Sequence, residues 1–387
     1  MKRLEGGISA VPGVSASGAR NGKYGLALIA ASGVAVGMFT KNRIRAAPLD
    51  VTAKNLENGW LDGVIANSGC ANCYTGLQGF RDAKDMAQMM ADLLKTDASK
   101  IGVASTGVIG RPMDMEIVGS LFHEAKVRLR SGPDASQEAA KAIMTTDTRA
   151  KEIAVENAGV HVAGIVKGAG MIEPNMATML CFIYTDADLP RAELKDCLAS
   201  AVADSFNMLT VDGDTSTNDT ILLTATGAQK CDVGAFREAL NHVCTELARM
   251  MARDGEGATK YFETVITGAR SEEDARSAAR SVARSSLVKT AIYGSDPNWG
   301  RIVAAVGRSR AQIDPECITL SLESNGCRVT LVEKGRIVQG VLDQAKEIMK
   351  GDSILIYVDL GLGNATARSF GCDLTHGYVD INANYTT

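Results

Sequence analysis

The chain has 387 residues, of which 45% are hydrophobic, so it can bury a large core arranged in two domains or lobes. Its formal net charge of −4 gives no general attraction to nucleic acid or to an anionic membrane, which favours a small-molecule substrate. Nine cysteines, and a start "MKRLEGGISA" that lacks the apolar core of a secretory signal, predict reduced thiols and a cytoplasmic protein.

The first long apolar segment is uncharged and covers residues 24–40. It is too short and too rich in small residues to span a bilayer comfortably, so we expect two buried strands that turn at Ser32-Gly33. Residues 81–95 predict a helix, because Met86 and Met90 recur on one face.

Short β-rich runs alternate with amphipathic windows along the rest of the chain, which predicts a mixed α/β fold but does not order the strands. The predicted strands lie near residues 63, 160, 179, 220, 318 and 353.

A further helix is expected over residues 271–284, opened by a capping interaction between Ser271 and Asp274. The same window carries arginines at four-residue spacing, which is one pattern of a phosphate-binding stripe. Three acidic residues come just before them, so we interpret the arginines as a solvated face instead. They are Arg276, Arg280 and Arg284.

Two motifs resemble metal sites but lack what a metal requires. Cys70 and Cys73 have the spacing of half a zinc site or a redox pair, yet no second pair and no nearby histidine accompany them. The segment "DGDTSTND" starts like a calcium loop, but Thr217 and Leu223 replace the glycine and glutamate that the loop needs. We expect no metal site.

Two other catalytic patterns are incomplete. Gly361-x-Gly363 follows a predicted strand like a dinucleotide fingerprint, but Thr366 replaces the third glycine and the sequence ends about twenty residues later. The four histidines have neither metalloprotease spacing nor a GxSxG partner, which argues against a histidine-based nucleophile.

A threonine nucleophile needs no histidine. When threonine is the first residue of a chain, its own α-amino group can take the proton of its hydroxyl. In "KGAGMIEPNMATML" the Ala177-Thr178 bond follows a turn-forming stretch, and self-cleavage there would expose Thr178. Oγ would attack the Ala177 carbonyl, the acyl group would shift from nitrogen to oxygen, and water would open the ester.

A second small-residue turn could stabilise the charge that such a reaction develops. In "GVASTGVIG" a hydroxyl from Thr106 and an N–H from Gly107 could point at one oxyanion, although a tight packing turn has the same composition.

Seven motifs in order resemble the glutamate N-acetyltransferase family, also called ornithine acetyltransferase, of arginine biosynthesis. The resemblance runs from Gly6 to Thr387. The motifs are "ANSGCANCYTG", "ASTGVIG", "KGAGMIEPNMATML", "VDGDTSTND", "RDGEGATK", "KTAIYGSDPNWGRI" and "INANYTT".

The resemblance implies a two-lobed, autoproteolysed α/β fold of the N-terminal-nucleophile type. The cut between Ala177 and Thr178 would give an α chain of residues 1–177 and a β chain of residues 178–387, intertwined in one protomer. Two α and two β chains would form a heterotetramer, without a metal, a nucleotide or another cofactor.

The resemblance also implies the site residues. Thr178 would be the nucleophile with its α-amino group as base, and Thr106 and Gly107 would form the oxyanion hole. One departure is Cys70, where the family commonly has Asn; we expect it not to touch the chemistry. The substrate-binding positions would be Thr145, Lys167, Thr178, Glu256, Asn382 and Thr387, with Thr146 an open alternative to Thr145.

The implied reaction is a double displacement through an acetyl-Thr178 ester, with N2-acetylornithine as donor, glutamate as acceptor and ornithine as first product. A bifunctional enzyme that also uses acetyl-CoA stays open, although no basic cluster suited to the CoA phosphates stands out in the sequence. An aminopeptidase-like amidohydrolase and a non-catalytic metabolite-binding protein are the remaining alternatives.

Overall fold

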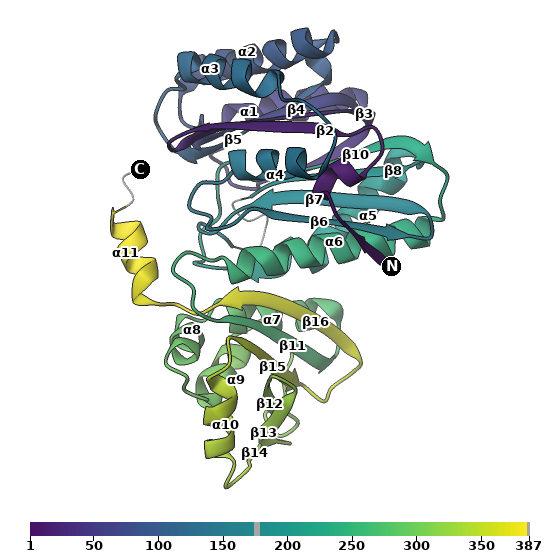
Figure 1. Cartoon of the computed structure of the whole chain (residues 1–387). Helices are drawn as coiled ribbons and strands as arrows, with labels where there is room; N and C mark the ends of the chain where they lie inside the picture. The colour runs from purple at the N-terminus through teal and green to yellow at the C-terminus, as the bar shows by residue number, and fades with distance from the viewer. Residues whose placement is uncertain (174–178, 385–387) are drawn as a thin grey trace.

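The computed structural model describes residues 1–173 and 179–384 of the chain. The predicted cleavage junction, Ala177-Thr178, and the predicted substrate position Thr387 lie outside the described residues. Figure 1 shows two lobes, each built on one β-sheet with helices packed against it. The predicted mixed α/β class is confirmed.

The first lobe contains a nine-stranded sheet in the order β1-β6-β7-β8-β10-β3-β4-β5, with β2 paired to β3. Its central strand β8 is buried at every position, which explains its uninterrupted apolar sequence. The strands are β1 (Lys2–Leu4), β2 (Ser15–Asn21), β3 (Tyr24–Phe39), β4 (Trp60–Cys70), β5 (Ile101–Val108), β6 (Lys151–Asn157), β7 (Val160–Lys167), β8 (Leu180–Ala187) and β10 (Thr220–Gln229).

The apolar segment near the N-terminus forms one strand, not two, so the expected turn at Ser32-Gly33 is wrong. β3 runs for 16 residues, and its pairing with β4 shifts register between Ala30 and Gly33. A Cβ at Gly33 would lie 2.1 Å from the Ala225 carbonyl oxygen, so the glycine admits the close approach of β10. The small residues permit an irregularity within a continuous strand.

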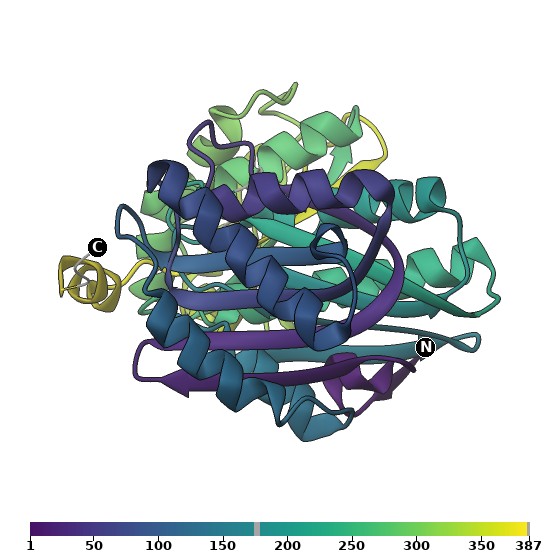
Figure 2. The same ribbon diagram turned by 90° about the horizontal axis from the view of Figure 1, so that it is seen from above.

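Several helices pack against the first sheet. Among them, α4 contacts β2, β3, β6 and β7. In Figure 2 the purple and blue helices of the N-terminal part lie across the strands. Met86 and Met90 of α2 are fully buried, as predicted. The helices are α1 (Ala47–Asn55), α2 (Gly76–Leu94), α3 (Met115–Lys126), α4 (Pro133–Ala142), α5 (Arg191–Asp204) and α6 (Val233–Arg253), with 3₁₀ turns η1 (Gly7–Ala10), η2 (Leu56–Asn58), η3 (Ala98–Lys100) and η4 (Phe206–Met208).

The second lobe contains a seven-stranded sheet in the order β14-β13-β12-β15-β11-β16-β9. β15 alternates half-buried and buried positions, as expected for a strand with one face on the core. Its elements are β9 (Leu209–Thr210), β11 (Tyr261–Ala269), α7 (Glu272–Ala283), α8 (Ser286–Tyr293), α9 (Trp299–Gly307), β12 (Thr319–Ser324), β13 (Cys327–Glu333), β14 (Arg336–Ile337), α10 (Leu342–Met349), β15 (Ser353–Asp359), β16 (Ala365–Cys372) and α11 (His376–Asn384).

The remaining predictions of elements are confirmed. The six predicted strands are β4, β7, β8, β10, β12 and β15, and the predicted helix at 271–284 is α7. The Ser271 side chain accepts a hydrogen bond from the Asp274 N–H at 3.1 Å, so it caps the helix as expected. No described helix is long and apolar enough to cross a membrane.

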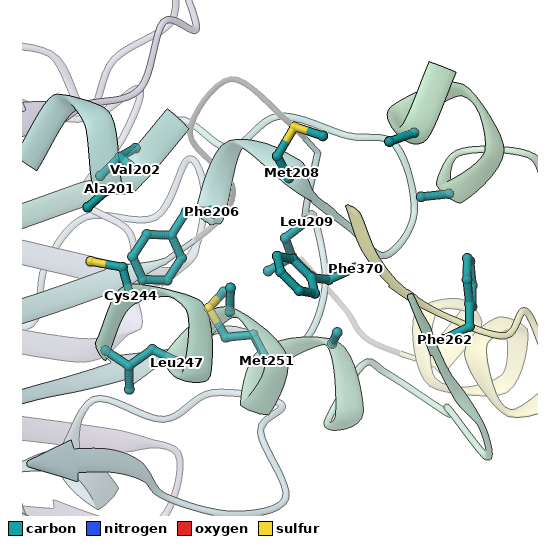
Figure 3. Close-up of a cluster of buried hydrophobic side chains, with 14 of the residues drawn as sticks. Ala201, Val202, Phe206, Met208, Leu209, Cys244, Leu247, Met251, Phe262 and Phe370 are labelled. Carbon is teal, nitrogen blue, oxygen red and sulfur yellow. The ribbon is translucent and has the colours of Figure 1, made fainter. Parts of the chain in front are cut away.

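One hydrophobic core joins the two lobes. Helix α6 contacts β6 and β7 of the first sheet and β16 of the second. Figure 3 shows Met251 of this helix between Phe206 of η4 and Phe370 of β16, with Leu247 one turn earlier in the same cluster. All four side chains are buried, so the lobes are held together by continuous apolar packing.

Candidate active site

The predicted oxyanion-hole residues lie at the carboxyl end of β5. Thr106 is buried, and Gly107 has a φ of 132°, a backbone conformation that favours glycine. A Cβ at Gly107 would lie 2.4 Å from the carbonyl carbon of Gly69 on β4. The pairing of β4 with β5 is irregular here, between Gly69 and Cys70. The small residues of "ASTGVIG" therefore serve a tight bend at which the ladder between two strands is interrupted.

Lys167, the last residue of β7, reaches this bend. Its ammonium donates a hydrogen bond to the Thr106 hydroxyl oxygen at 3.2 Å, and both side chains are buried. Because the hydroxyl oxygen accepts from the lysine, the hydroxyl hydrogen is left to donate elsewhere. Lys167 thus orients the predicted oxyanion donor.

A buried charge network surrounds the lysine. Asp147 accepts hydrogen bonds from the Lys151 ammonium at 2.6 Å and from the Gly168 N–H at 2.7 Å. The Lys151 ammonium also pairs with Asp254. Burial alone would raise the pKa of Asp147, but Lys167, Lys151 and the backbone donor hold it at about 2. Burial lowers the pKa of Lys167, while the charge of Asp147 opposes this shift.

Thr145 lies next to the same network. Its backbone N–H donates to the Asp147 carboxylate at 3.0 Å, and both Thr145 and Thr146 are half-buried. The backbone contact favours Thr145 as the residue held in a defined place, but both threonines remain candidates for the substrate contact.

Glu256 and Asn382 meet beside the loop that follows β7. The Glu256 N–H donates to the Ala169 carbonyl at 2.8 Å, and a Cβ at Gly170 would lie 2.4 Å from the Glu256 carboxylate. The Asn382 amide of α11 donates to the same carboxylate at 2.8 Å. Two predicted substrate residues that are 126 positions apart are therefore in direct contact.

Two aspartates of the loop before β10 bind the described residues on both sides of residues 174–178. Asp212 accepts hydrogen bonds from the N–H groups of Met171 and Ile172, at 2.6 and 2.8 Å. Asp219 accepts from the Met179 N–H at 3.2 Å, and burial raises its pKa well above the ordinary value. These roles were not predicted from the sequence, although both aspartates lie in the motif "VDGDTSTND". Their carboxylates bind backbone N–H groups, which is a structural use of a segment that resembles a calcium loop.

Cys70 lies closer to the site than expected. Its backbone is opposite Thr106 in the β4–β5 pairing. Its thiol, however, is directed to the Arg111 carbonyl oxygen at 3.4 Å, and burial raises its pKa. The residue shapes the bend through its backbone.

The described part of the predicted site thus forms one connected group. Leu180, two positions after Thr178, pairs with Lys167 across β7 and β8, and Lys167 contacts Thr106. The start of β8, just after the predicted cut, therefore lies beside the predicted oxyanion hole. This arrangement of a hydroxyl, a buried cation and a carboxylate–amide pair could bind a zwitterionic substrate and stabilise an oxyanion.

Comparison with known proteins identifies relatives of the chain. The model of the ArgJ family matches residues 12–387. The chain is 51% identical over 395 residues to a glutamate N-acetyltransferase of Methanosarcina mazei, covering 100% of both chains. It is 48% identical over 381 residues to an arginine biosynthesis bifunctional protein ArgJ of Archaeoglobus fulgidus, covering 98% of this chain and 100% of the relative.

A solved structure is also similar. The crystal structure of the arginine biosynthesis bifunctional protein argJ from Bacillus halodurans aligns with a TM-score of 0.50 at 38% identity. The alignment covers 53% of this chain and 98% of the solved chain.

Proposed function

The chain belongs to the ArgJ family of arginine-biosynthesis acyltransferases, and from this membership we propose that it transfers an acetyl group from N2-acetylornithine to glutamate. The observation that carries the proposal is the contact of the Lys167 ammonium with the Thr106 hydroxyl, beside the point where β8 enters the sheet. Ornithine is the first product and N-acetylglutamate the second, which recycles the acetyl group within the pathway.

The acetyl carbonyl oxygen binds between the Thr106 hydroxyl and the Gly107 N–H. Charge develops on this oxygen when the carbonyl is attacked, and donors fixed in a buried site stabilise it without reorganisation. Lys167 supports the hole because its side-chain nitrogen donates to the Thr106 hydroxyl oxygen, which leaves the hydroxyl hydrogen to donate to the oxyanion.

Thr178 is the nucleophile. Its Oγ forms a bond to the acetyl carbon, its α-amino group takes the hydroxyl proton and delivers it to the leaving amine, and the bond from carbon to ornithine nitrogen breaks. The amine of glutamate then attacks the carbonyl carbon of the acetyl-threonine ester, the bond from this carbon to Oγ breaks, and the α-amino group carries the amine proton to Oγ as N-acetylglutamate leaves. An α-amino group has a reference pKa of about 7.7–8.0, so near neutral pH it can act as base without large tuning.

The amino-acid end of the substrate is held by the remaining predicted residues. The Glu256 carboxylate can pair with a substrate ammonium, and the Asn382 amide can donate to a carboxylate or accept from an amine. Thr145 and Thr387 contribute hydroxyls to the same end.

Self-cleavage between Ala177 and Thr178 generates the nucleophile. Hydrogen bonds from the N–H groups of Ile172 and Met179 to the carboxylates of Asp212 and Asp219 support this step, because they fix both sides of the segment that is cut. The solved Bacillus chain matches over 98% of its own length but 53% of this chain, close to the share of residues 178–387, which number 210 of 387. We further propose that two fragment pairs form a heterotetramer.

A cytoplasmic location belongs to the same proposal. All nine cysteines are free thiols in the structure, which agrees with a reducing compartment.

The test is product analysis of the purified protein supplied with N2-acetylornithine and glutamate. We expect equal amounts of ornithine and N-acetylglutamate, and no turnover in Thr178→Ala. Free acetate as the main product, unchanged by glutamate, would instead identify an amidohydrolase. No acyl transfer in an uncut 40.7 kDa chain would identify a metabolite-binding protein.

Acetyl-CoA as a second donor is the alternative within the family, and it is favoured by the relative in Archaeoglobus fulgidus that is named bifunctional. Glutamate and acetyl-CoA without acetylornithine form the decisive assay. Rapid formation of N-acetylglutamate under these conditions would establish the bifunctional enzyme.

A further inference from the structure

A cavity rich in arginine lies in the second lobe, apart from the Thr106 and Lys167 contact. Its volume is about 640 Å³, and helix α7 and the segment after α9 form most of its wall. Glu173, the last described residue before the predicted cleavage site, lies at its edge. The lining residues are Glu173, Ser277, Arg280, Ser281, Arg284, Arg308, Ser309 and Arg310.

The charges of the cavity are unbalanced. Its described lining contains four guanidinium groups and one carboxylate, and that carboxylate, Glu173, is paired with Arg284 at 2.7 Å. Arg308 donates to the Ser281 carbonyl oxygen at 3.2 Å. The guanidinium groups of Arg280 and Arg310 form no hydrogen bond or ion pair with a described residue. Two forked cationic donors are therefore available to an anion.

The arginines also repel each other. Burial lowers the pKa of Arg280, and the like charges of Arg276 and Arg284 lower it further. An anion bound among these side chains would remove this repulsion. Among the described lining residues, Glu173 is the one carboxylate that can offset this repulsion.

This cavity corrects the expectation that the chain lacks a basic cluster. The expected solvated face holds for Arg276, which pairs with Asp204 at 2.6 Å outside this cavity, and for Arg284, whose side chain is 53% exposed. Arg280 and Arg284 also line one cavity with Arg308 and Arg310, which lie more than twenty positions later in the sequence. Helix packing brings the four together.

We propose that this cavity binds a ligand that carries two or more neighbouring phosphate groups, of the kind found in a nucleotide-linked acyl carrier or in free pyrophosphate. Forked guanidinium groups match phosphate oxygens in pairs, and the serine hydroxyls of Ser277, Ser281 and Ser309 add further polar lining. The volume exceeds that of one small anion, so a larger polyanion fits the space better. The inference concerns binding and does not rest on the proposed acetyl transfer from N2-acetylornithine.

The experiment is calorimetric titration of the purified full-length protein with pyrophosphate, with coenzyme A, and with pantetheine as a carrier fragment without phosphate. We expect pyrophosphate or coenzyme A to bind and pantetheine not to bind. Arg280→Gln and Arg310→Gln should each weaken binding by about tenfold or more, because each removes a charged hydrogen-bond donor.

Arg276→Gln is the matched control. It removes the same charge from the same helix, but its guanidinium pairs with Asp204 and Glu272 outside the cavity. The affinity of this variant for pyrophosphate or coenzyme A should stay within about twofold of the wild type, since surface ion pairs contribute little.

The outcomes separate the sources of the phosphate groups. Binding of coenzyme A that needs Arg280 and Arg310 identifies the acyl carrier, whereas binding of pyrophosphate alone identifies a smaller phosphate ligand; both support the proposal. It is overturned if neither ligand binds, or if the two cavity variants bind as tightly as Arg276→Gln. Transfer from N2-acetylornithine to glutamate should continue in all three variants, so failure here leaves the proposed function standing.

Discussion

At the scale of single residues, the hydroxyl of Thr106 is the group on which the proposed oxyanion hole depends most directly. Thr106→Ala removes a donor that acts as charge develops, so we expect kcat to fall by about a hundredfold or more with a smaller change in KM. Steady-state kinetics with N2-acetylornithine measure both. Thr106→Ser keeps the hydroxyl and should retain most activity. A change confined to KM in the alanine variant would contradict the role.

The buried carboxylate of Asp147 should make stability depend on acid. Its pKa is held at about 2, below the ordinary value of 3.8, so its contribution is present above about pH 4 and is lost as pH falls toward 2. The pKa difference corresponds to about 2–3 kcal/mol of unfolding free energy at neutral pH.

Asp147→Asn should therefore destabilise the protein at neutral pH and flatten the loss of stability between pH 4 and pH 2. Urea unfolding across this range measures the effect. Asp50→Asn serves as control, since Asp50 forms an exposed ion pair with Arg45 at 3.0 Å. Equal pH profiles for Asp147→Asn and the wild type would show that the buried network does not set acid stability.

At the scale of elements, helix α11 is joined to the site by few contacts. It has no buried side chain and projects from the body in Figures 1 and 2. Its Asn382 amide reaches Glu256, while among the described residues the Asn384 amide bonds within the helix, to the Asp380 carbonyl oxygen at 2.8 Å. The two asparagines thus separate a site contact from a helix contact.

Asn382→Ala should raise KM for both N2-acetylornithine and glutamate, by an amount equivalent to about 1.5–3 kcal/mol for a hydrogen bond to a charged group. Self-cleavage should continue, because Thr106 and Lys167 are not altered. Asn384→Ala should leave both KM values near the wild type. If the two variants behave alike, the helix does not hold the substrate.

At the scale of the whole molecule, the order of the first sheet predicts that the two fragments stay together. Strands β8 and β10, which belong to the proposed C-terminal fragment, lie in the middle of the sheet, between β7 and β3 of the proposed N-terminal fragment. Separating the fragments would break two strand interfaces and expose the buried faces of β8.

Denaturing gels should therefore show fragments of about 19 and about 22 kDa, in proportion to 177 and 210 residues, that co-elute in one native peak. Thr178→Ala should remain one chain and elute in the same oligomeric state. Cleavage of that variant at the same bond would exclude Thr178 as the agent, and separate native elution of the fragments would contradict the role of the sheet.

The sequence by itself determined the features that depend on local pattern. Alternation and apolar runs located β8 and β15, helical periodicity located α2, and Ser271 marked the start of α7. Motifs named Thr106 and Lys167 as site residues. The predictions of elements succeeded because secondary structure is governed largely by residues close in sequence, whereas the roles of Thr106 and Lys167 stay predictions.

Only the tertiary structure decided what depends on distant partners. Pairing with β4 on either side of the register shift, and the close approach of β10, keep β3 continuous through Gly33, where the sequence predicted a turn. Lys167 contacts Thr106 across 61 positions, and helix packing places Arg280 and Arg310 in the lining of one cavity. Sequence spacing carries no record of such contacts, because they arise when the sheets and helices bury their apolar faces together, and that packing fixes where the charged side chains converge.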